Sequence, residues 1–194
     1  MEAVYYVYGC PFSGFKFILA ITLMKFLIAI GSKEYSEPTL RLGMRVAKAF
    51  NAAVTIVYVG EKISAFSTSG VHLAQENLEN WELDRQGVDV LAWAFKYLAD
   101  NGYLSTESEG EGFNIGKLVQ TDEDRCEVYL EGNHTQEVGL ILRNGDIIQQ
   151  LRDEVNKRAF DITIIGASKK RSMAHDLIQY IDSSIFVVKN YQPD

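Results

Sequence analysis

The segment from residue 24 to residue 59 constrains the fold of this chain more than any other. An apolar run, Lys25–Ile30, leads into a polar loop at 31–36, and an amphipathic run then reaches a second apolar run at 54–59. This order is typical of one strand–helix–strand unit of a parallel sheet. Ligands of such sheets bind beyond the carboxyl ends of the strands. The loop after Ile30 is therefore the first place to expect binding chemistry.

The helix of this unit is predicted from its capping residues and its apolar spacing. Ser36 is a suitable N-cap and Pro38 suits a first turn. Apolar and small residues then recur at helical spacing and give one face for the sheet; they are Leu40, Gly43, Met44, Ala47 and Phe50.

Further elements follow in the same alternation. A loop is predicted at 61–70 and a long helix from about Leu73 to Ala99, ended by Asn101 and Gly102. Three more strands are predicted at 137–142, at 161–165 and from Ile185 to Lys189, and Asp146 caps a helix before the second of them. The alternation predicts an α/β fold with a doubly wound, five-stranded parallel sheet of order 3-2-1-4-5 and helices on both faces.

Two segments stand outside this rhythm. Residues 1–23 are predicted to be an N-terminal extension with an added strand near 4–8, and residues 24–194 form one domain interrupted at about 103–136. The stretch 102–136 holds eight acidic and two basic residues, and the whole chain has a net charge of −7. Glycines, acids and two short β-like runs at 116–120 and 127–130 indicate a mobile or hairpin insertion there. This acidic insertion is either solvated surface or a flap that docks a protein partner or gates the cleft.

Composition excludes several function classes. The rest of the chain is nearly neutral, so no broad basic face for nucleic acid is expected. The apolar run at 12–30 is long enough for a membrane anchor, but an anchor would consume the first predicted strand, so no membrane association is expected. Cys10 and Cys126 form neither a disulfide framework nor a metal spacing, which favours a reduced, cytoplasmic compartment. The histidines are scattered, and neither a metal site nor a catalytic constellation is predicted.

Four segments in this order resemble the universal stress protein family. They read IAIGSKEYSEPTL at 28–40, VTIVYV at 54–59, RNGD at 143–146 followed by a helix and FDITIIG at 160–166, and IDSSIFVVK at 181–189. The resemblance implies a sheet of adenine-nucleotide-binding type, a homodimer, and a stress-related role without established enzymatic chemistry.

The motif of the family's nucleotide-binding members is only partly present. Those members carry Asp at the end of strand one, where this chain has Gly31, and Gly-x2-Gly-x9-Gly-Ser/Thr after strand four. Gly166 matches the first glycine, Lys169 replaces the second, most of the spacer is missing, and Arg171 and Ser172 stand where Gly-Ser belongs. We therefore expect no ATP binding in the usual family mode and no bound cofactor. Val59 ends the second strand at the same edge and completes the candidate site.

Three basic residues, 169–171, precede the predicted helix capped by Ser172. They form either an anion site, with Lys169 and Arg171 replacing glycine amides, or an inert solvated turn. Three functions remain open. The favoured one is a non-enzymatic stress-related or regulatory protein. It is expected to form a homodimer through the predicted strand Ile185–Lys189, because an apolar edge strand is usually covered. The alternatives are a sensor that binds adenine nucleotide or phosphate weakly, and a disfavoured nucleotide hydrolase or adenylating enzyme.

Overall fold

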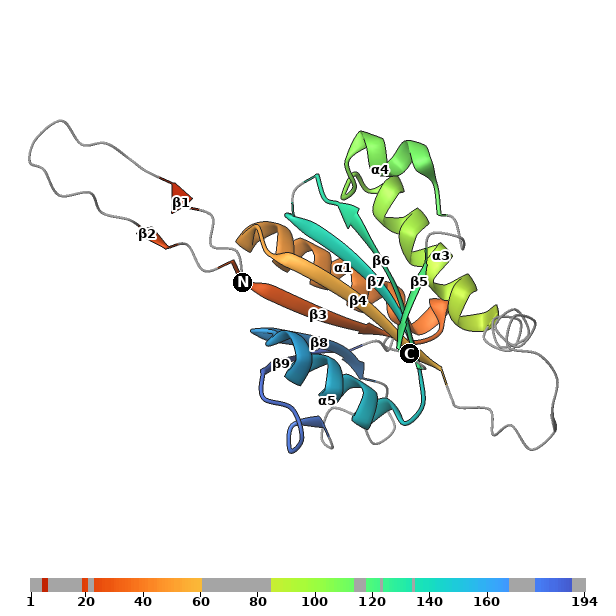
Figure 1. Cartoon of the computed structure of the whole chain (residues 1–194), viewed down its shortest axis with the longest axis vertical. Coiled ribbons are helices and arrows are strands. Elements are labelled where there is room, and N and C mark those ends of the chain that lie inside the picture. The colour runs from red at the N-terminus through yellow and green to blue at the C-terminus, as the bar shows by residue number, and fades with distance from the viewer. Residues whose placement is uncertain are drawn as a thin grey trace, which may run out of the picture.

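The computed structural model describes residues 5–6, 19–20, 23–60, 85–113, 118–122, 124–133, 135–167 and 177–189 (Figure 1). In these residues the main domain contains β3 (Lys25–Ile30), α1 (Lys33–Phe50), β4 (Ala53–Gly60), α3 (Arg85–Asp100), α4 (Thr106–Glu111), β5 (Val119–Asp122), β6 (Arg125–Glu131), β7 (Glu137–Asn144), α5 (Ile147–Arg158), β8 (Ile162–Ala167) and β9 (Ser184–Lys189). In the N-terminal extension, β1 (Tyr5–Tyr6) and β2 (Leu19–Ala20) pair with each other in an antiparallel sheet of their own.

Across the described residues the main sheet has seven strands in the order β5-β6-β7-β4-β3-β8-β9. The five strands β7, β4, β3, β8 and β9 are parallel, and among themselves they follow the predicted order 3-2-1-4-5. The predicted strand count was wrong. The predicted hairpin of the insertion is present as β5 and β6, but it adds two antiparallel strands to β7 and makes the sheet mixed.

Helices cover both faces of the parallel strands, as predicted. In Figure 1, α1 and α3 lie behind the sheet and α5 lies in front. Along β3 the side chains alternate: Phe26, Ile28 and Ile30 enter the core beneath α1 and α3, whereas Leu27 enters the core beneath α5. A strand buried on both faces reads as a continuous apolar run, which explains the Lys25–Ile30 sequence. None of the described helices is both long enough and apolar enough to cross a bilayer.

Helix α1 begins earlier than predicted. Ser32, not Ser36, is the N-cap residue, and Pro38 lies inside the helix. The hydroxyl of Ser36 instead accepts a hydrogen bond from the backbone N–H of Gly31 at 2.7 Å. Gly43 faces the sheet so closely that an added Cβ would lie 2.7 Å from Ile28 Cδ1. The glycine therefore lets the helix pack tightly on β3.

The other predicted boundaries fall close to the observed ones. Helix α3 ends at Asp100, and the N–H of Gly102, at φ 66°, donates to the carbonyl of Ala99. Asp146 caps α5 through a 2.9 Å hydrogen bond from the N–H of Gln149. The predicted loop at 61–70 and the first part of the helix predicted from Leu73 lie outside the described residues.

Candidate functional site

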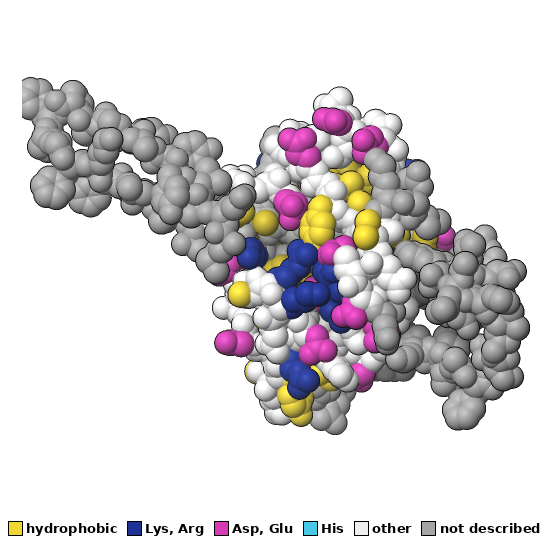
Figure 2. Space-filling model, in the orientation of Figure 1, with side chains coloured by type: hydrophobic (Ala, Val, Ile, Leu, Met, Phe, Trp, Pro, Cys, Tyr) yellow, Lys and Arg dark blue, Asp and Glu magenta, His cyan; other side chains and the backbone are white. Residues whose placement is uncertain are grey.

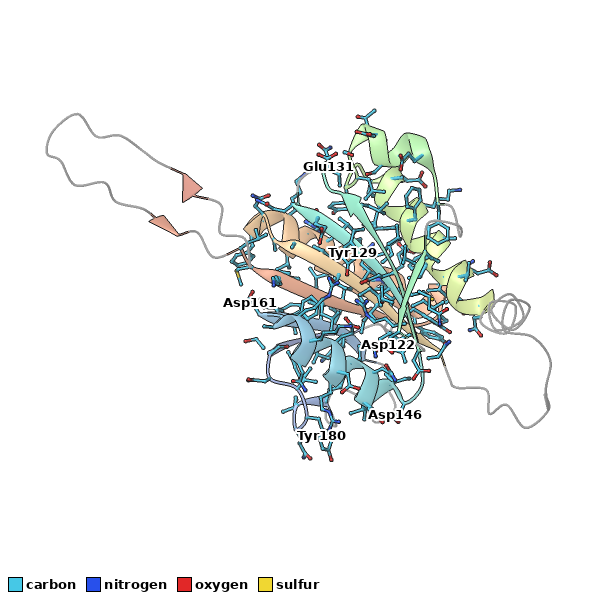
Figure 3. All side chains as sticks on the ribbon, in the orientation of Figure 1. Asp122, Tyr129, Glu131, Asp146, Asp161 and Tyr180 are labelled. Carbon is cyan, nitrogen blue, oxygen red and sulfur yellow. The ribbon has the colours of Figure 1, made fainter. Side chains whose placement is uncertain are left out.

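The carboxyl ends of the parallel strands bring three predicted site residues to one edge of the sheet. Gly31 directly follows β3, Val59 lies near the end of β4, and Gly166 lies near the end of β8. The register confirms the proximity, since Ile30 pairs with Tyr58 and Ala29 pairs with Ile165. Figure 3 marks this end of the sheet by Asp146 and the opposite end by Asp161. The other three predicted residues, Lys169, Arg171 and Ser172, lie outside the described residues.

At this edge Gly31 offers open space and no side-chain functional group. It is exposed, and a Cβ added to it would meet no heavy atom within 4 Å. The N-cap Ser32 makes no side-chain hydrogen bond to the first turn of α1. Val59 packs against the apolar core on the α5 side, and Tyr58 is 8% exposed in the opposite core. This part of the edge therefore offers backbone groups and an apolar side chain.

Among the described residues, no cluster of three or more His, Cys, Asp or Glu side chains is arranged to hold a metal ion. Asp89 is exposed on α3. The described part of this edge also carries three acids, Asp122 at the end of β5, Asp124 before β6 and Asp146 at the start of α5, and Asp146 is engaged in capping the helix.

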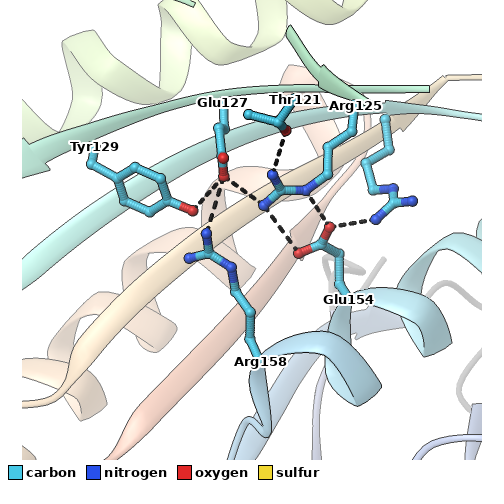
Figure 4. A network of polar contacts seen from close by, with 7 residues as sticks. Thr121, Arg125, Glu127, Tyr129, Glu154 and Arg158 are labelled. Atoms are coloured by element: carbon cyan, nitrogen blue, oxygen red, sulfur yellow. Dashed lines mark hydrogen bonds and ion pairs between the residues drawn. The ribbon is translucent and has the colours of Figure 1, made fainter. Parts of the chain in front are cut away.

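A buried ionic network, which the sequence analysis did not predict, joins the hairpin to α5 (Figure 4). Arg125 on β6 is 2% exposed and Glu154 on α5 is fully buried. Arg125 Nε donates to Glu154 Oε1 at 2.6 Å, and Arg143 of β7 donates to the same oxygen. Arg125 Nη1 also donates to the hydroxyl of Thr121 on β5 at 2.7 Å. One carboxylate therefore links two strands and a helix. We call the network the α5 seam; its members are Thr121, Arg125, Glu127, Tyr129, Arg143, Glu154 and Arg158.

Glu127 forms the second half of the α5 seam. Its Oε2 atom accepts from Arg125 at 2.6 Å, from Arg158 at 3.1 Å and from the Tyr129 hydroxyl at 2.5 Å. The guanidinium of Arg158 lies over the Tyr129 ring, 4.7 Å from its centroid. In Figure 2, basic side chains gather in the middle of this face, between the strands and α5.

The electrostatics of the α5 seam follow from burial and close partners. Burial raises the pKa of Glu127, but hydrogen bonds from Arg125 and Tyr129 and nearby positive charge outweigh it, so the pKa lies below its usual value. Burial and the hydrogen bond to Glu127 together raise the pKa of Tyr129 to about 12. Burial opposes the charge of Arg125, but its carboxylate partners raise the guanidinium pKa above the ordinary value. The charged groups thus hold one another in place.

Two sequence patterns could have revealed the α5 seam. On β6, Arg125, Glu127 and Tyr129 alternate with Cys126, Val128 and Leu130, so one face is polar and the other apolar. On α5, Gln150, Glu154 and Arg158 are four residues apart and form one stripe. Neither pattern tells which strand the helix stripe will meet, because that depends on β6 pairing with β7.

The last strand of the sheet, β9, carries exposed apolar side chains. Phe186 is 43% exposed and Val187 is 41% exposed. Ile178 and Tyr180, in the turn that precedes β9, are also exposed, and Tyr180 is labelled in Figure 3. Large apolar side chains gathered at one edge are typical of a surface that another protein covers.

Solved structures of universal stress proteins resemble this chain in three dimensions. UspA from Lactobacillus plantarum has a TM-score of 0.51 and 13% sequence identity, over 85% of this chain and 97% of that chain. The chain has the universal stress protein fold. A universal stress protein solved in complex with cAMP has a TM-score of 0.50 and 11% identity, over 87% of this chain and 98% of that chain. No protein-family model and no curated protein sequence matches the chain.

The universal stress protein fold confirms the resemblance read from the four sequence segments. At these identities the likeness concerns the fold alone. The candidate binding residues of this chain therefore have to be judged from their own surroundings.

Proposed function

We propose that this chain is a non-enzymatic, stress-related or regulatory protein of the universal stress protein type that does not bind ATP in the usual family mode. The observation that carries the proposal is Gly31, which leaves open space where a carboxylate is expected. The altered sequence after Gly166 supports it, because Lys169 replaces a glycine whose backbone would let phosphate approach. Among the described residues, no group of three or more His, Cys, Asp or Glu side chains is arranged to hold a metal ion, which is consistent with the proposal.

In this proposal the protein acts as a homodimer through the segment from Ile185 to Lys189. Exposed Phe186 and Val187 support this interface, since a six-residue outer strand with apolar side chains is a ready site for association. The exposed turn residues Ile178 and Tyr180 would enlarge the same surface.

A second candidate function is a sensor that binds adenine nucleotide or phosphate weakly. The cAMP complex of a protein with this fold favours it, as does the basic run from Lys169 to Arg171 ahead of Ser172. Under this alternative, phosphate or sulfate raises the melting temperature more than chloride does at equal ionic strength. The Lys169→Ala, Lys170→Ala, Arg171→Ala triple variant separates specific binding from general salting-out, which it should retain.

Calorimetric titration with ATP, AMP and cAMP tests the first proposal. It predicts no saturable heat, or dissociation constants weaker than about 1 mM (about −4 kcal/mol), for all three. A dissociation constant of about 10 μM or tighter (about −7 kcal/mol) for ATP would overturn the non-binding proposal. Saturable binding of AMP or cAMP alone would favour the sensor.

The variant Gly31→Asp tests the missing carboxylate at position 31 separately from the altered sequence after Gly166. Open space around Gly31 predicts that the variant folds with a melting temperature within about 2 °C of the parent. Because the glycine loop is altered as well, Gly31→Asp alone should not bring the ATP dissociation constant below about 100 μM (about −5.5 kcal/mol). Gly31→Ala is the matched control. Tighter binding by Gly31→Asp would show that the remaining loop is competent and would favour the sensor.

A further inference from the structure

Strand β7 would be the outer strand of the parallel sheet if the hairpin were absent. Six consecutive residues of β7, from Val138 to Arg143, are buried. The hairpin supplies their neighbour: β6 pairs with β7 over seven residue pairs, from Arg125 opposite Arg143 to Glu131 opposite Glu137. Strand β7, which has the longest run of consecutive buried residues in this half of the sheet, thus lies next to the inserted hairpin.

The hairpin replaces this edge by one that is unsuited to association. β5, the new outer strand, has four residues, and all four are exposed. It carries Gln120 and Asp122, and native proteins commonly protect sheet edges with short strands and charged residues. The hairpin therefore exchanges a long edge for a short one that carries three polar residues and a single apolar residue, Val119.

The two ends of the parallel sheet are complementary in direction. β9 and β7 run the same way, because each is linked through parallel pairings to β3. A β9 strand from one molecule can therefore continue the parallel sheet of a second molecule beyond β7. Such a contact joins different surfaces, so it can repeat without closing.

The α5 seam fixes the hairpin over this edge. Arg125 reaches from β6 to Glu154 on α5 and to Thr121 on β5, so one buried side chain ties both hairpin strands to the domain. Removing one partner of a buried ion pair is strongly destabilising, because the remaining charge stays in a poorly solvated place.

We propose that the hairpin β5–β6 is an edge cap whose release exposes β7 as a docking surface for β9 of a second copy of this chain. Arg125 ties the cap to α5, in addition to the pairing of β6 with β7 and the hydrogen bonds between Glu131 and the start of α4. With the cap in place, association stops at the small assembly that β9 alone can form. With the cap released, β9 pairs with β7 of the next molecule in place of its contact in the small assembly, and this pairing builds open-ended chains of molecules.

The test compares the full-length chain with Arg125→Ala. Hydrogen exchange should show amide protection in β6 falling at least tenfold in the variant, while protection in β3 and β4 is retained. Sedimentation velocity at tens of micromolar should then show assemblies larger than dimers that grow with concentration. Arg152→Ala is the matched control, because it removes an arginine of α5, the helix that Arg125 contacts, whose side chain is 45% exposed and makes a 3.8 Å contact to Asp153.

A second substitution identifies the contact. Val187→Lys in the Arg125→Ala background should abolish the large assemblies if they form between β9 and β7. Assemblies that survive Val187→Lys would overturn the proposal, as would a detached β6 without any change in assembly. Unchanged protection of β6 in Arg125→Ala would show that Arg125 does not hold the cap. If circular dichroism shows Arg125→Ala to be unfolded, the milder variant Arg125→Lys takes its place. Lysine keeps the positive charge and loses the planar guanidinium with its several donors, and the same outcomes decide.

Discussion

The two ends of the parallel sheet are treated in opposite ways. At the β7 end, an inserted hairpin adds two strands and the buried α5 seam ties them down. At the β9 end, a six-residue strand is the outermost strand of the described sheet and exposes Phe186 and Val187. The β7 edge is covered by an inserted hairpin, whereas the β9 edge leaves apolar side chains where another molecule can reach them.

Under the edge-cap proposal, the insertion limits assembly without a binding motif of its own. Buried ion pairs roughly balance their desolvation cost, so we expect the α5 seam to add little net stability compared with an apolar replacement. The seam holds the hairpin against α5, because Glu154 accepts hydrogen bonds from Arg125 of β6 and from Arg143 of β7.

The largest expected effect is on the closed end. Glu154→Ala removes the carboxylate shared by Arg125 and Arg143 and leaves two buried cations without it. We expect the free energy of unfolding to fall by about 3–5 kcal/mol in urea denaturation. Asp153→Ala, one residue along the helix with a 42% exposed side chain, should change it by less than about 0.5 kcal/mol. Similar losses in the two variants would contradict the role given to the α5 seam.

A smaller effect is expected where Tyr129 packs on the sheet. Gly139 lies opposite Tyr129 in the β6–β7 pairing, and an added Cβ would lie 2.8 Å from the ring. Gly139→Ala should therefore lower the unfolding free energy by about 1–3 kcal/mol. The control is Gly110→Ala in α4, where an added Cβ meets nothing within 4 Å and alanine favours the helix. Equal stability of the two variants would show that the ring can move aside.

The smallest effect concerns the Tyr129 hydroxyl. Tyr129→Phe removes its hydrogen bond to Glu127 and should cost about 1 kcal/mol at neutral pH. The pKa of Tyr129 is raised from 10.0 in the unfolded chain to about 12 in the fold, so this group's stabilisation is complete below pH 10 and declines as pH rises through about 12. Parent and Tyr129→Phe should therefore converge in alkaline denaturation. A constant difference across this range would argue against the raised pKa.

The sequence predicted the parallel half of this fold well because each of its signals is local. The continuous apolar run Lys25–Ile30 and the cap at Asp146 depend on neighbours within a few residues. The attachment of the hairpin was missed because Arg125 and Glu154 are 29 residues apart and meet only after β6 has paired with β7. The start of α1 was missed because Ser32 and Ser36 are both acceptable N-caps, and the bond from Gly31 to Ser36 decides between them.

The candidate site was predictable in position but not in content. That Gly31, Val59 and Gly166 share an edge follows from strand order, which the alternation of elements dictates. The open space beside Gly31 depends on packing around the first turn of α1, and no sequence pattern reports it.

The contrast between the two ends is tested most directly by placing the same charge on each outer strand. Val187→Lys on β9 and Val119→Lys on β5 alter side chains that are 41% and 60% exposed, so neither should disturb the fold. Sedimentation equilibrium should show that Val187→Lys weakens dimerisation at least tenfold, about 1.4 kcal/mol, because the lysine would be buried in the interface. Val119→Lys should leave it unchanged. A monomeric parent at tens of micromolar, or a dimer weakened by Val119→Lys and not by Val187→Lys, would contradict the account.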